Sequence, residues 1–201
     1  MAITRRNGVS TKQQLLDAAR AVLQRDGVAA LSTRAVGAEA GVNLSLIHYY
    51  FGSRDGLLLA ILEQMDADLL ARQRAMYGRA DSSLAAKWRQ AIDYYHQDLQ
   101  SGYVRTLLEL AAHGYSNPEM AERVRGLMTG WRNLLTEVAE AATERFGISA
   151  LEPAEIASVI VSFWLGTELQ HLLGVTEEEG RLWQTLDTFG RLIERLENGE
   201  E

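Results

Sequence analysis

The chain has 201 residues, 47% of them hydrophobic, no cysteine and a net charge of −7, of which residues 1–60 carry +3 and the remainder −10. The absence of cysteine excludes disulfides and thiolate metal sites, and no apolar run reaches the roughly 18 residues of a membrane span, so we expect a soluble, cytoplasmic protein. A basic end on an acidic body is typical of a chain whose N-terminal segment alone contacts phosphate, although chance clustering of solvated charges would give the same imbalance.

Few helix breakers and the lack of period-2 stretches favour an all-α chain, because the sequence has only two prolines and is rich in Ala, Leu, Glu and Arg. Residues 1–8, which include Arg5 and Arg6, show no apolar period and are expected to form an arm that can reach phosphate or a minor groove. Ser10 with Gln13 then matches a capping box, and apolar residues recur at helical spacing up to Gly27.

Residues 31–51 predict two short helices around a tight turn. Ser32 or Thr33 can cap the first helix, which ends at Gly41, and Asn43 can cap the second. The apolar positions that can be buried together are Leu31, Val36, Ala40, Val42, Ile47 and Phe51. The polar positions left facing outward are Thr33, Arg34, Asn43, Ser45, His48 and Tyr49. This arrangement is a helix-turn-helix, whose second helix enters a DNA major groove.

Two tyrosines are adjacent at the end of this motif. Neighbouring helical residues point about 100° apart, so at most one of Tyr49 and Tyr50 can be fully buried. We predict that Tyr49 is the outward residue.

The most specific part of the N-terminal third is the run Tyr49-Tyr50-Phe51-Gly52-Ser53-Arg54-Asp55-Gly56-Leu57-Leu58, which follows Thr33-Arg34-Ala35-Val36 and Glu39-Ala40-Gly41-Val42. With a first helix from Thr11, this pattern resembles the TetR family of transcriptional regulators. Gly37, His48 and Arg54 stand where that family usually has alanine, tyrosine and lysine. The resemblance implies that phosphate is contacted by Thr33, Tyr49 and Arg54. It also implies that the residues lying toward the bases or the groove walls are Arg34, Asn43, Ser45 and His48.

A long helix follows the motif. Ser53 can cap it, and the pattern runs from Arg54 to about Tyr77, some 24 residues or about 36 Å. No Gly/Ser/Pro linker interrupts it, so the connection to the rest of the chain is expected to be rigid. We predict a helix-turn-helix DNA-binding domain over residues 1–53 and a second domain over residues 54–201.

The rest of the chain also predicts helices only. Helix starts are indicated after Ser83, after Gly102, near Pro118, at Pro153 and at about Glu177. The total is about nine helices, with no internal repeat. The resemblance implies that this second, α-helical domain binds an effector and forms a dimer.

The second domain is rich in aromatic and hydrogen-bonding side chains. Such a mixture suits a ligand cavity, and it equally suits an aromatic core whose polar tips reach backbone groups. The resemblance favours a cavity for a small-molecule effector of unknown identity, for which the candidate lining residues are Met65, Trp88, His113, Trp131 and Trp164.

The last two helices are apolar over more than one narrow stripe, which favours contact with a second copy of the chain over a broad contact within one chain. The candidate interface residues are Ile160, Phe163, Leu186, Phe189 and Ile193. Gly166 lies in the same region and would let two backbones approach closely.

No catalytic or cofactor motif is recognisable. The sequence lacks Gly-x-Gly-x-x-Gly, Gly-Lys-Ser/Thr and Gly-x-Ser-x-Gly patterns, and its four histidines lack spacing typical of metal ligands. We therefore expect no enzyme, no metal and no cofactor. The leading hypothesis is a homodimeric, ligand-responsive repressor acting on a palindromic double-stranded DNA operator. The alternatives are a small-molecule carrier or enzyme that retains the motif as a packing element, and an adaptor that binds another protein.

Overall fold

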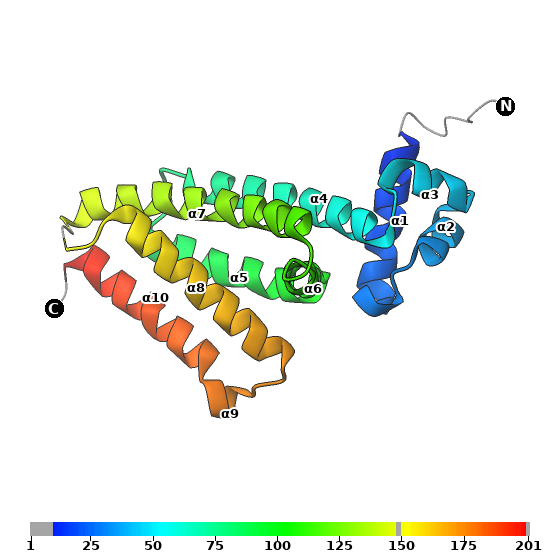
Figure 1. Ribbon diagram of the computed structural model, residues 1–201. Helices are drawn as coiled ribbons and strands as arrows, with labels where there is room; N and C mark the ends of the chain where they lie inside the picture. Colours follow the sequence, from blue (N-terminus) through cyan, green and yellow to red (C-terminus); the bar gives the residue numbers. More distant parts are fainter. Residues whose placement is uncertain (1–9, 148–149, 200–201) are drawn as a thin grey trace. The chain divides into compact units, whose positions relative to one another are not determined.

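A computed structural model describes residues 10–147 and 150–199, so the predicted arm with Arg5 and Arg6 lies outside the described residues. The described residues form ten α-helices and one 3-10 turn and contain no strand, which confirms the all-α prediction (Figure 1). The helices are α1 (Thr11–Asp26), α2 (Thr33–Ala40), α3 (Leu44–Phe51), α4 (Arg54–Tyr77), α5 (Leu84–Ser101), α6 (Tyr103–His113), α7 (Pro118–Phe146), α8 (Pro153–Leu172), α9 (Glu177–Gly180) and α10 (Leu182–Asn198), and the 3-10 turn is Val28–Ala30.

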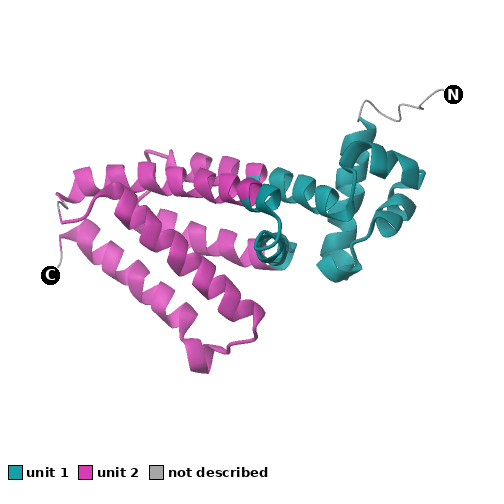
Figure 2. Ribbon diagram, viewed as in Figure 1, with its two compact units in different colours: residues 1–66, 100–121 teal, residues 67–99, 122–201 magenta. Residues whose placement is uncertain are grey.

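The chain divides into two compact units, residues 1–66 with 100–121 and residues 67–99 with 122–201 (Figure 2). The first unit thus contains the helix-turn-helix, the first half of α4, and α6. The second contains most of α5 and α7 together with α8 to α10. The predicted boundary between residues 53 and 54 stays a prediction.

The first unit is built on α1, whose start and end follow the predicted signals. The Gln13 N–H donates to Ser10 Oγ at 3.2 Å, and the Gly27 N–H donates to the Leu23 carbonyl at 3.0 Å. Helix α1 packs against α2, and α2 packs against α3, because helices as short as α2 and α3 bury too little surface by themselves. The fully buried side chains of this core include Leu15, Val22, Leu31, Val36 and Ile47.

The C-terminal region has one helix more than the sequence pattern predicts. A single helix was expected from about Glu177, but α9 and α10 are separated at Arg181, whose φ of 49° is left-handed. The cause is local capping. Thr176 and Glu179 form a capping box that starts α9, and the Glu177 carboxylate accepts the Trp183 and Gln184 N–H groups, both at 3.0 Å, which starts α10 anew.

The C-terminal helix is attached to the start of α5 within the second unit. The Glu197 carboxylate accepts the N–H groups of Leu84 and Ala85 at 2.8 and 2.9 Å and pairs with Arg145 at 3.2 Å. These charge-assisted bonds satisfy amide groups that a helix start leaves unpaired. Among the helices of the described residues, none is both long and apolar enough to cross a membrane.

Candidate functional site

The helix-turn-helix is positioned by three local signals that the sequence carries. The Ala35 N–H donates to Ser32 Oγ at 3.1 Å, and the Ser45 N–H donates to Asn43 Oδ1 at 2.9 Å. Gly41 has a φ of 66°, a left-handed conformation that glycine adopts without a Cβ penalty, and so ends α2. The two caps and the turn fix how α3 leaves α2.

One face of α3 is exposed and carries polar and aromatic groups. Tyr49 is 79% exposed, whereas Tyr50 is half-buried and packs edge-on against Tyr49 with 5.0 Å between ring centroids. The prediction that Tyr49 is the outward residue is confirmed. Ser45 and His48 are exposed on the same side of the helix. The face therefore offers hydroxyl and imidazole groups on a rigid element.

His48 has a defined orientation. Its Nδ1 lies 3.1 Å from the Gly52 carbonyl oxygen, which can only accept a hydrogen bond. Nδ1 is therefore protonated, and in a neutral ring Nε2 is an acceptor. An exposed acceptor on α3 suits an exocyclic amino group of a base.

Arg54 is held at the start of α4 by groups of the first unit. Its guanidinium donates to the carbonyls of Leu31 and Val28 at 2.8 and 2.9 Å and pairs with Glu109 of α6 at 3.0 Å. The side chain is still 37% exposed. Arg54 thus fixes the chain segment before α2, and its predicted contact with phosphate stays a prediction.

A second side-chain contact lies beside this ion pair. His113 Nδ1 of α6 is 3.0 Å from Asp55 Oδ2, so the first two residues of α4 both pair with α6. His113 was predicted to line an effector cavity, and its side chain is 42% exposed at this position. Sequence patterns did not indicate either pair, since the partners are more than 50 residues apart.

The other predicted cavity residues have different surroundings. Met65 is buried in the first unit, whereas Trp88, Trp131 and Trp164 are half-buried in the second. Trp88 and Trp164 contact each other with 6.4 Å between ring centroids, and Trp88 Nε1 donates to the Leu186 carbonyl at 2.9 Å. This indole has the backbone partner that a buried aromatic core residue needs.

A group of polar side chains in the interior of the second unit was not predicted. The Arg72 guanidinium of α4 pairs with Asp98 of α5, and burial nevertheless raises the pKa of Asp98. Burial, followed by repulsion from Asp98, raises the pKa of Glu168 on α8 to about 8. Tyr95 is buried in the same interior, and burial raises the pKa of its hydroxyl. The sequence feature that could have indicated this group is an acidic residue one helical turn after an aromatic residue, as in Tyr95/Asp98 and Trp164/Glu168.

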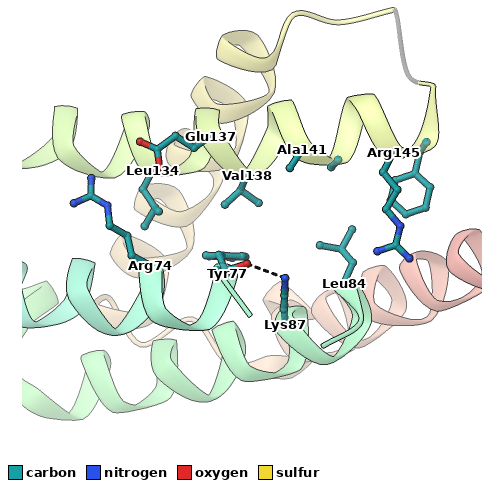
Figure 3. Close-up of a pocket in the computed structure, with 12 residues that line it drawn as sticks. Arg74, Tyr77, Leu84, Lys87, Leu134, Glu137, Val138, Ala141 and Arg145 are labelled. Carbon is teal, nitrogen blue, oxygen red and sulfur yellow. Dashed lines mark hydrogen bonds between the residues drawn. The ribbon is translucent and has the colours of Figure 1, made fainter. Parts of the chain in front are cut away.

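Among the pockets formed by the described residues, two lie wholly within the second unit, and neither is lined by the five predicted cavity residues. The first, of about 370 Å³, lies between α4, α5 and α7 (Figure 3). The second, of about 300 Å³, is lined by α8, α9 and α10. The first has mainly apolar walls with cationic side chains around them, whereas the second has a mixed lining.

The last long helices present an exposed apolar surface. On α8 and the residue after it, Val159, Leu169 and Leu173 are 67%, 50% and 74% exposed and fall within an arc of about 80° at 100° per residue. On α10, which lies beside α8 (Figure 1), Phe189, Leu192 and Leu196 are 44%, 47% and 59% exposed. We call these six residues the α8/α10 face.

Of the predicted interface residues, one belongs to the α8/α10 face and the other four do not. Phe189 belongs to it, and Ile160, Phe163 and Ile193 are half-buried. Leu186 is 1% exposed and packs inside its own chain, so it has no surface to offer a partner. Gly166 lies in the α8 arc. Apart from its chain neighbours and the nearby backbone of α8, no heavy atom of the described residues lies within 4 Å of where its Cβ would be, so packing within these residues does not itself require glycine there.

Comparison with known proteins places the motif in a family. Residues 15–61 match the family described as "Bacterial regulatory proteins, tetR family". The nicotine-responsive transcriptional repressor HdnoR of Paenarthrobacter nicotinovorans is 25% identical over 166 residues, which cover 81% of this chain and 84% of that protein. The transcriptional regulator BetI of Vibrio parahaemolyticus is 36% identical over 69 residues, 32% of this chain and 35% of that one.

Solved structures share the fold over nearly the whole chain. A TetR-family regulator from Pectobacterium atrosepticum has a TM-score of 0.70 at 21% identity, covering 90% of this chain and 91% of that one. The fatty acid degradation regulator FadR of Bacillus halodurans has a TM-score of 0.70 at 16% identity, with 94% and 96% covered. At these identities the likeness concerns the fold.

Proposed function

The chain belongs to the TetR family of bacterial regulatory proteins, and on this premise we propose that it is a ligand-responsive transcriptional repressor that binds a palindromic operator as a homodimer. The observation that carries the proposal is the exposed face of α3, held by the Ser32 and Asn43 caps and the Gly41 turn. A rigid helix that presents polar groups to solvent is the part that reads a major groove.

The proposed DNA contacts fall into two classes. Thr33, Tyr49 and Arg54 contact phosphate and position the domain, whereas Arg34, Asn43, Ser45 and His48 lie toward the bases. The exposure of Tyr49, whose hydroxyl is at the tip of the side chain, supports a phosphate contact. The acceptor Nε2 of His48 supports recognition of an adenine N6 or cytosine N4 amino group.

Salt titration tests DNA binding by the full-length protein. A dimer with about 6 to 10 phosphate contacts should lose roughly 10³- to 10⁵-fold in affinity between 50 and 200 mM salt. Tyr49→Phe should weaken binding to all duplexes alike, because it removes only a phosphate contact. His48→Ala should change sequence preference within a panel of selected fragments. Equal effects of both variants on every duplex would contradict the proposed division of roles.

Arg54→Ala is expected to act on stability as well as on DNA affinity. The variant leaves the Leu31 and Val28 carbonyls and the Glu109 carboxylate without their common donor, at a cost of about 1 to 3 kcal/mol in the free energy of unfolding. Glu109→Gln separates the effect on stability from the effect on DNA affinity. It keeps Arg54 and removes the carboxylate that would compete with DNA phosphate for the guanidinium. If Arg54 contacts phosphate, Glu109→Gln raises duplex affinity in a low-salt binding assay; unchanged affinity would assign Arg54 a structural role only.

The α8/α10 face supports the proposed homodimer. Exposed apolar side chains gathered on two neighbouring helices are typical of a surface covered by a partner. A two-fold axis through this face would use the same residues from both copies, so that Phe189 and Leu192 of one chain meet the equivalent surface of the other. Such a dimer presents two α3 helices to half-sites about 34 to 36 Å apart, or a multiple of it.

The effector part of the proposal is supported by the pockets of the second unit and by the relative named as a nicotine-responsive repressor. The cavity proposed from sequence, lined by Met65, Trp88, His113, Trp131 and Trp164, is retained as a separate candidate. The competing function, a carrier or enzyme that keeps the motif for packing, predicts that no duplex binds to residues 32–54 at any salt concentration.

A further inference from the structure

The pocket between α4, α5 and α7 combines an apolar lining with cationic side chains around it (Figure 3). Leu134 and Val138 of α7 point toward α4 and α5, and Leu84 lies opposite them on α5. A volume of about 370 Å³ is within the range of small-molecule sites. The walls can therefore bury an apolar chain or ring.

The charges around the pocket are unbalanced. Its lining contains three cations, Arg74, Lys87 and Arg145, and one acid, Glu137. Arg145 is paired with Glu197, but Lys87 Nζ donates to the neutral carbonyl of Tyr77 at 2.8 Å. Within residues 10–147 and 150–199, neither Lys87 nor Arg74 forms an ion pair.

This local excess of positive charge contrasts with the net negative charge of residues 61–201. Residues 61–201 carry −10, so two such cations at one pocket are a local departure. Tyr77 also lines the pocket, and burial raises the pKa of its phenol to about 12. A cation without an anionic partner at the edge of an apolar wall, as at Lys87, matches an anionic oxygen attached to an apolar group.

We propose that this pocket binds an amphipathic carboxylate. Its carboxylate lies at Lys87, and its apolar part lies against Leu134 and Val138. The binding of this ligand to the pocket is independent of the proposed function. Its role as the effector of the repressor rests on the proposed function.

Calorimetric titration of the DNA-free, full-length protein with decanoate, decanol and decylamine, each below its micelle concentration, tests the ligand class. Decanoate should bind about tenfold or more tightly than decanol, because only the carboxylate receives charge-assisted hydrogen bonds. Octanoate should bind roughly tenfold more weakly than decanoate, because it buries two fewer methylenes. Decylamine should bind most weakly. Decylamine binding as tightly as decanoate would overturn the proposal.

The lysine content of the chain provides a test of location. Lys12 and Lys87 are the only lysines, and Lys12 lies on α1, away from the pocket lining. Saturating decanoate should slow acetylation of Lys87 by acetic anhydride at least severalfold, with Lys12 as the reference in the same mass spectrum. Equal rates with and without decanoate would overturn the proposed site.

Matched variants separate charge from folding. Lys87→Met keeps the length of the side chain and should weaken decanoate binding about tenfold while leaving decanol binding unchanged; Lys12→Met should change neither. Loss of decanoate selectivity without loss of decanol binding supports the proposal, and unchanged decanoate affinity overturns it. These measurements contain no DNA, so a negative result would contradict the ligand proposal and not the proposed repressor function. Conversely, a protein that binds no operator would contradict the repressor function and not the assignment of the pocket.

Discussion

Leu169→Arg is expected to convert the proposed dimer into a monomer. Leu169 is half exposed in the single chain and would be covered in the dimer, where an unpaired guanidinium costs about 3 to 5 kcal/mol. The two-fold axis places the substitution in the interface twice, so the dissociation constant of the dimer should rise by at least roughly a hundredfold. Sedimentation velocity over a concentration series measures the change, with Thr129→Arg on the exposed side of α7 as the control.

Gly166→Leu tests the same interface without adding a charge. Leucine in a helix interior is favoured over glycine by about 0.8 kcal/mol, and beyond the chain neighbours and nearby backbone of α8 no heavy atom of the described residues lies within 4 Å of the new Cβ. The variant should therefore fold as well as the parent or better, yet dimerise more weakly, because two backbones can no longer approach at this point. Gly126→Leu on α7 has equally open surroundings and should leave the dimer unchanged. If both glycine variants remain dimeric, α8 does not form the interface.

The helices could be predicted closely because their ends are determined by neighbouring residues. Ser10, Ser32 and Asn43 each cap the helix that the sequence assigns to them, and α4 has the predicted bounds of Arg54 and Tyr77. The exception is the break at Arg181. There the Glu177 side chain caps a helix that begins five residues later, a contact that spacing rules for capping do not include.

The site could be predicted only where it depends on a single element. The outward direction of Tyr49 follows from the helical period of α3 and the burial of Ile47. The ion pair between Arg54 and Glu109 joins residues 55 positions apart, and the Arg72–Asp98 pair joins helices whose packing no local pattern specifies. Likewise, Leu186 belongs to the apolar stripe of α10, but only the fold shows that it faces inward.

Glu168→Gln is expected to stabilise the protein above neutral pH and to remove part of its pH dependence. The pKa of Glu168 is about 8 in the folded chain, against an ordinary value of 4.5, because burial and the neighbouring Asp98 disfavour its ionised form. Below pH 4.5 the residue is protonated in both states and has no effect. Between pH 4.5 and 8 the unfolded chain is ionised while the folded chain retains the proton, so stability falls as pH rises; above pH 8 the full penalty persists.

The amide introduced by Glu168→Gln has no proton to lose, so the variant should gain roughly 2 to 4 kcal/mol at pH 8.5 and almost nothing at pH 4.5. Urea unfolding at equal protein concentration and at several pH values measures the difference, since a dimer's stability depends on concentration. Glu178→Gln, on the exposed α9, is the control. Asp98→Asn should have the opposite sign, because it leaves the Arg72 guanidinium without its carboxylate. A Glu168→Gln variant whose stability curve runs parallel to that of the parent from pH 4.5 to 8.5 would show that Glu168 ionises freely in the folded protein, and that the interior around Tyr95 and Asp98 admits water.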